Sequence, residues 1–84
     1  MPLALVKSAA PEVTNYRVLS PRGYIGRASH TAPLAPTTPA FAYCYSTREQ
    51  AEQVARGFPG SVIEAWGTVN TPNGYRQILI GKVA

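Results

Sequence analysis

The chain has little of the chemistry that enzymes and metalloproteins use. Cys44 is its one cysteine, so no internal disulfide can form, and His30 is its one histidine, so there is no cluster of zinc ligands. Aspartate is absent, which leaves neither Cys44 nor a serine with a histidine–aspartate pair to activate it. We therefore expect no catalytic residue, no metal site and no cofactor.

Long apolar runs are also missing. No stretch approaches the ~20 residues that a membrane-spanning helix needs. The apolar start, MPLALVK, lacks the basic leader and the small-residue cleavage site of a secretory signal. These features predict a soluble protein of the cytoplasm.

What is present is typical of a small folded domain. Of the 84 residues, 45% are hydrophobic and 14% are charged, which is unlike the composition of a disordered chain. Eight Lys and Arg residues stand against four Glu residues, so the net charge is +4. This charge favours an acidic partner or a nucleic acid, although a role in solubility explains it equally well.

The first third of the chain has the pattern of a β-hairpin. Strands are expected at 13–19 and 24–27, and Ser20-Pro21-Arg22-Gly23 between them has the residues of a turn. Alternation places Tyr16 and Val18 on the same face of the first strand.

A loop and a third strand follow. Residues 29–39 have a proline at every third position, which predicts a loop and permits a polyproline II conformation. Residues 40–45 alternate small and aromatic side chains, which predicts a strand with Tyr43 and Tyr45 on one face. The small face should receive a helix, so we expect Cys44 to be buried there.

One helix is predicted to begin at Ser46. The run Ser46-Thr47-Arg48-Glu49 is typical of a capping box, in which Ser46 is the cap and Glu49 reaches back to it. An apolar stripe follows at helical spacing, formed by Ala51, Val54, Ala55 and Phe58. Gly57 and Pro59 predict the end of the helix.

Two further strands are predicted at 61–69 and 75–83, joined by a turn that contains Asn73-Gly74. Alternation turns Ile63 inward and leaves Glu64 and Trp66 on the opposite face. The predicted fold is therefore α+β, a single antiparallel sheet of about five strands in the chain order β-β-β-α-β-β, with one helix packed on one face. We expect residues 13–84 to form this domain and residues 1–12 to be an arm or an edge strand.

The first hairpin carries a group of cations and a tyrosine: Arg17, Arg22, Tyr24 and Arg27. Arginine pairs with phosphates and carboxylates, and tyrosine offers a surface for stacking. If these side chains converge, they form a cationic binding edge. The alternative is that they are dispersed charges that prevent edge-to-edge aggregation.

A second group of candidate contacts is aromatic, on the sheet face that one helix cannot cover: Trp66 and Tyr75, with Arg76 beside them, and one face of the strand at 40–45. Exposed aromatic residues with arginine are typical of interface hot spots. Burial of this patch under the arm at 1–12 is the alternative.

The element order and the segment 43–55, Tyr-Cys-Tyr-Ser-Thr-Arg-Glu-Gln-Ala-Glu-Gln-Val-Ala, resemble small phage and mobile-element proteins, in which a strand leads into a capped T-x-E-x-A helix. Some of these are anti-CRISPR proteins, similar to this chain in size and in the sheet-plus-helix plan. The resemblance covers the outline of residues 13–83, has no diagnostic motif, and implies an inhibitor that binds a host defence complex stoichiometrically. Many such inhibitors are acidic, so this cationic chain would instead engage an acidic protein surface or the guide and target nucleic acid.

Three functional hypotheses follow. The first is a non-enzymatic interaction module of phage type, which inhibits a CRISPR-type ribonucleoprotein complex in the host cytoplasm. The second is a small basic nucleic-acid-binding protein that uses the Arg and Tyr residues of the hairpin. The third is a structural protein that associates with itself, as a homodimer, through the open sheet face.

Overall fold

The structure, a computed structural model, describes residues 12–83. It contains one antiparallel sheet of five strands, in the order β3-β2-β1-β4-β5, and a single α-helix. The α+β class and the predicted order of strands and helix are thereby confirmed. The arm or edge strand predicted at 1–12 lies, apart from Glu12, outside the described residues.

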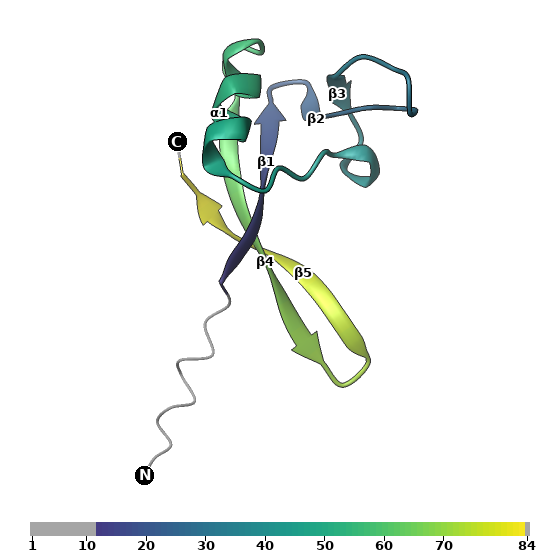
Figure 1. Cartoon of the computed structure of the whole chain (residues 1–84), viewed down its shortest axis with the longest axis vertical. Coiled ribbons are helices and arrows are strands. Elements are labelled where there is room, and N and C mark those ends of the chain that lie inside the picture. Colours follow the sequence, from purple (N-terminus) through teal and green to yellow (C-terminus); the bar gives the residue numbers. More distant parts are fainter. Residues whose placement is uncertain (1–11, 84) are drawn as a thin grey trace.

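The strands are β1 (Val13–Ser20), β2 (Gly23–Gly26), β3 (Ala35–Thr37), β4 (Val62–Thr71) and β5 (Gly74–Lys82). A short 3-10 helix, η2, spans Pro39–Phe41, and α1 spans Arg48–Arg56. Figure 1 shows α1 beside β1 and β4, and the β4–β5 hairpin extending away from the helix.

The core lies between α1 and one face of the sheet. Val18 on β1 pairs with Ile63 on β4, and directly opposed residues share a face, so both point towards the helix. Val18 and Ile25 are fully buried there, with Ala51 of α1 above them. The remaining residues of the predicted helical stripe pack against this cluster: Val54, Ala55 and Phe58. The predicted faces of the first strand and of the helix are therefore correct.

The proline-rich segment contains an edge strand where a loop is predicted. β3 pairs with β2, with Pro36 opposite Ile25. Proline has no N–H to donate, but an edge strand needs hydrogen bonds on one side alone, so Pro36 is tolerated there. Proline does keep this segment out of the sheet interior, but does not prevent pairing.

The strand predicted at 40–45 does not form. After η2 the segment touches the sheet through two isolated bridges, Ala42 to Gly26 and Tyr45 to Tyr16. Tyr45 enters the core and Cys44 is exposed, so the expected burial of Cys44 is wrong. The pairing of β1 with β2 is short, and the segment contacts each of these strands once beyond the end of that pairing, which is too little to form a strand.

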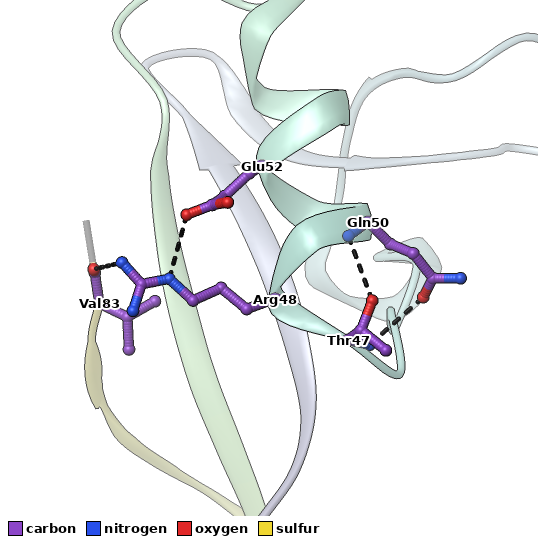
Figure 2. Close-up of polar contacts among 5 residues, drawn as sticks. All are labelled: Thr47, Arg48, Gln50, Glu52 and Val83. Carbon is purple, nitrogen blue, oxygen red and sulfur yellow. Dashed lines mark hydrogen bonds and ion pairs between the residues drawn. The ribbon is translucent and has the colours of Figure 1, made fainter.

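Helix α1 begins one residue later than predicted (Figure 2). Thr47 is the N-cap: its hydroxyl accepts from the Gln50 N–H at 3.2 Å, and the Gln50 side chain accepts from the Thr47 N–H at 3.3 Å. The Ser46 N–H also donates to Gln50 Oε1. A capping box is therefore present, with Thr47 and Gln50 in the roles predicted for Ser46 and Glu49.

An arginine joins α1 to the end of the last strand. Arg48 forms an ion pair with Glu52 at 3.1 Å and donates to the carbonyl of Val83 at 2.9 Å (Figure 2). The segment after β5 is thus tied to the first turn of the helix. In the described part of the chain, no helix has the length and apolar character needed to cross a membrane.

Candidate binding surface

The sheet face that points away from α1, here called the helix-distal face, carries a network of polar and aromatic side chains. The cross-strand pairs Arg17–Glu64 and Asn15–Trp66 place four of them side by side on β1 and β4. The side chains that this network joins are those of Asn15, Arg17, Tyr24, Glu64, Trp66 and Gln77, and Asn15 also donates to the Thr14 hydroxyl.

Glu64 is the centre of this network. Its residue surface is 3% exposed, and its Oε1 accepts from the Tyr24 hydroxyl at 2.7 Å and from the Trp66 indole N–H at 3.0 Å. A buried carboxylate is costly unless donors surround it. Tyr24 and Trp66 provide those donors, so the three side chains hold one another in fixed positions.

Tyr24 has a changed acidity in this setting. Burial, then the hydrogen bond to Glu64 and the charge of Glu64, raise the pKa of Tyr24 to about 12, while Arg17 acts in the opposite direction. All three causes disfavour a tyrosinate, because burial removes water, the hydrogen bond to Glu64 needs the hydroxyl proton, and Glu64 would face a second negative charge. The hydroxyl therefore remains a donor throughout the physiological range.

Arg17 lies over the indole ring of Trp66, with its guanidinium carbon 4.0 Å from the ring centroid. The same guanidinium donates to Gln77 Oε1 at 2.6 Å and to Asn15 Oδ1 at 3.2 Å. A cation–π contact and two hydrogen bonds thus fix a side chain that is usually mobile. The guanidinium is only partly buried, so it presents a positioned positive charge on the surface.

Three of the residues predicted from sequence meet here: Arg17, Tyr24 and Trp66. The other hairpin cations lie apart from them. Arg22 is in the turn before β2, and Arg27 follows the end of β2 and donates to the carbonyl of Ala32 at 3.4 Å.

The remaining predicted contacts, Tyr75 and Arg76, are exposed near the tip of the β4–β5 hairpin. Tyr75 is opposite Asn70 in register, so it shares the helix-distal face with Trp66. Residues 40–45 do not extend that face. Tyr45 instead belongs to the core on the helix side, with Tyr43 stacked on it at a ring separation of 4.7 Å.

Sequence reasoning missed the polar partners that organise the surface. Asn15 and Gln77 are 62 positions apart and meet only because β1 and β5 flank β4. Glu64 did carry a signal, since it is a lone charge inside the apolar run Val62-Ile63-Glu64-Ala65-Trp66. A charge in such a strand needs a partner from a neighbouring strand.

No group of three or more metal-ligating side chains occurs within residues 12–83. Comparisons with protein-family models, with curated proteins and with solved structures found no match to this chain.

Proposed function

We propose that this protein is a non-enzymatic binding module that associates stoichiometrically with an acidic protein surface through its helix-distal face. The observation that carries the proposal is the fixed Arg17–Trp66 stack, held by Asn15 and Gln77 on one side and by Glu64 on the other. Tryptophan, tyrosine and arginine are the residue types most enriched in interface hot spots.

Preorganisation supports this use of the surface. Immobilising a mobile side chain on binding costs about 0.5–1.5 kcal/mol. Arg17 already has its side chain fixed in the free protein, so a partner would avoid most of that cost. A partner carboxylate can meet the guanidinium without disturbing the contact with Trp66.

The same stack favours a protein partner over single-stranded nucleic acid. Nucleic-acid surfaces of this kind stack bases on open aromatic faces. Arg17 occupies one face of Trp66 at 4.0 Å, so that face is closed to a base. The spread of Arg22 and Arg27 to opposite ends of β2 also gives no single track for a phosphate backbone.

A narrower proposal follows from the resemblance to small phage proteins. The module would then inhibit a CRISPR-type complex in the host cytoplasm by occupying an acidic surface. Size and the sheet-plus-helix plan support this version, and no residue of the surface is specific to it.

The test uses the tagged full-length protein as bait against purified bacterial defence complexes, followed by size-exclusion chromatography to measure stoichiometry. We expect a complex with one defined ratio. Trp66→Ala and Arg17→Ala should weaken it at least tenfold, and Arg56→Ala on the exposed side of α1 should leave it unchanged. Failure to bind any of these complexes would contradict the proposal that the protein is a CRISPR inhibitor.

The broader proposal is contradicted if a complex forms with undiminished affinity for both surface variants. A mobility shift of DNA or RNA at low salt that disappears steeply with added salt would favour the nucleic-acid hypothesis instead. A dimer in solution scattering would favour self-association.

A further inference from the structure

We infer that the outer edge of β5 takes up an extended segment of the partner protein as an additional strand, and that this segment alternates acidic with apolar side chains. The inference rests on the proposed function, because it specifies how the binding module would engage its partner. The added strand would pair with the backbone of β5, whereas the contact in the proposed function is made by the side chains of Arg17 and Trp66.

The two edges of the sheet are built differently. β3 has three residues and contains Pro36, two features that blunt an edge against further pairing. β5 has nine residues, Gly74–Lys82, and none is proline. Tyr75 is 81% exposed and Leu79 is 47% exposed on it. A long edge with exposed apolar side chains is a template for another strand.

The outward-facing backbone groups of β5 can be identified from its pairing with β4. The turn between Thr71 and Gly74 directs the Gly74 backbone towards β4, and successive residues then alternate in direction. Tyr75, Gln77 and Leu79 therefore turn their N–H and C=O groups to the open edge. A bulge in β5 lies opposite Ala65 and Trp66. Beyond it the chain hydrogen-bonds to β4 again, and the Val83 N–H donates to the Ile63 carbonyl oxygen at 2.9 Å.

Side-chain direction gives the chemistry of the added strand. Tyr75 and Leu79 lie on the helix-distal face, so partner residues opposite them should be apolar. Arg76, opposite Val69, lies on the other face with Ile78, opposite Gly67, so the partner residue beside Arg76 should be acidic. A segment that alternates acidic with apolar residues places a carboxylate beside Arg76 and apolar side chains beside Tyr75 and Leu79.

Charge distinguishes this occupant from a second copy of the chain. β5 carries two cations, Arg76 and Lys82, and no carboxylate. Within the described residues, the ion pair that forms joins Arg48 to Glu52, and neither β5 cation takes part in it. A second β5 would bring more positive charge to this edge, whereas an acidic segment neutralises it.

The probe is a short synthetic peptide in which valine and glutamate alternate, with a matched peptide that has lysine in place of glutamate. Each is titrated into the full-length protein, and amide hydrogen exchange is followed by NMR. The glutamate peptide should bind saturably, with a Kd below about 1 mM, and slow exchange at Tyr75, Gln77 and Leu79. The lysine peptide should not.

Substitutions separate charge from backbone pairing. Arg76→Glu should weaken binding of the glutamate peptide about tenfold and allow the lysine peptide to bind. Arg56→Glu changes the net charge equally on exposed α1 and should leave both affinities unchanged. Leu79→Pro removes one outward N–H without breaking the β4–β5 ladder, so it should weaken binding far more than Leu79→Ala does.

The inference is overturned if the glutamate peptide fails to bind, if it protects amides elsewhere, or if both peptides bind equally. It is also overturned if Tyr75, Gln77 and Leu79 are already protected in a peptide-free dimer. Loss of a protein partner in Trp66→Ala with no peptide effect on β5 would remove the inference and keep the proposed function. Protection of β5 by the glutamate peptide, together with a protein partner that still binds Trp66→Ala and Arg17→Ala unchanged, would keep the inference and remove the proposed function.

Discussion

The Tyr24 hydroxyl donates a 2.7 Å hydrogen bond to Glu64, although the two residues lie on strands that are not neighbours. Tyr24 is on β2 and Glu64 is on β4, with β1 between them in the sheet. The bond therefore crosses over β1 on the helix-distal face. Together with the Trp66–Glu64 bond it makes this surface a connected unit.

The first prediction concerns pH. The pKa of Tyr24 is raised from its ordinary value of 10 to about 12, so the unfolded chain loses this proton first as pH rises. The protonated Tyr24 hydroxyl therefore stabilises the folded state fully below pH 10, and this contribution to the free energy of unfolding is lost between about pH 10 and 12. Ultraviolet titration of tyrosinate should show a group that ionises near pH 12, which Tyr24→Phe removes and Glu64→Gln shifts downwards.

Burial also raises the pKa of Tyr45, with a further contribution from Tyr43, so Tyr45→Phe is the matched control. It should leave the Tyr24 transition in place. A wild-type titration in which every tyrosine ionises together near pH 10 would contradict this description of Tyr24.

The second prediction concerns the buried carboxylate. Glu64→Ala leaves two donors, Tyr24 and Trp66, without their acceptor, so we expect a loss of about 2–4 kcal/mol in the free energy of unfolding. Glu64→Gln keeps an oxygen at the same position and should cost about 1 kcal/mol. Urea denaturation measures the free energy of unfolding of both variants. Equal losses would show that the hydrogen bonds accepted by Glu64 Oε1 do not stabilise the fold.

The third prediction concerns the Arg17–Trp66 stack. Arg17→Ala removes the cation–π contact and the bonds to Gln77 and Asn15, and should destabilise the fold by about 1–2 kcal/mol. Because Trp66 is the one tryptophan in the chain, its fluorescence should also change in the folded state. Arg22→Ala, in the exposed turn, is the control. An unaltered Trp66 spectrum in Arg17→Ala would argue against the stack.

The fourth prediction concerns Gly26, where β2 approaches the last residue of η2. A Cβ at this position would collide with the Phe41 carbonyl oxygen, so Gly26→Ala must displace backbone. We expect a loss of about 1–3 kcal/mol, as in other overpacked sites. Gly81→Ala meets no atom within 4 Å and should be close to neutral in thermal unfolding. Similar behaviour of the two variants would contradict the close approach.

The fold was predictable where local pattern and burial agree. The alternation in β1 and the apolar stripe of α1 each indicate one buried face, and the core residues Val18, Ala51 and Val54 lie on those faces. The capping box was displaced by one residue because Thr47 with Gln50 satisfies the same geometry as Ser46 with Glu49. Local sequence does not distinguish the two pairs.

Prediction failed where tertiary pairing decides. The segment 40–45 has a strand pattern, but it bridges β2 and β1 at one residue each, beyond the end of their short pairing, so no strand forms and Cys44 is exposed. Three residues of the binding surface were predicted from the sequence, namely Arg17, Tyr24 and Trp66. Its polar partners Asn15 and Gln77 come from strands far apart in sequence, so only the sheet order brings them together.

Hydrogen–deuterium exchange on the complex with a captured partner tests the central claim most directly. We expect slower exchange in β1 around Arg17, in β4 around Trp66 and along β5, with α1 unchanged between the free and bound protein. Protection confined to α1 or to the β1–β2 turn, with β4 and β5 unaffected, would contradict binding through the helix-distal face.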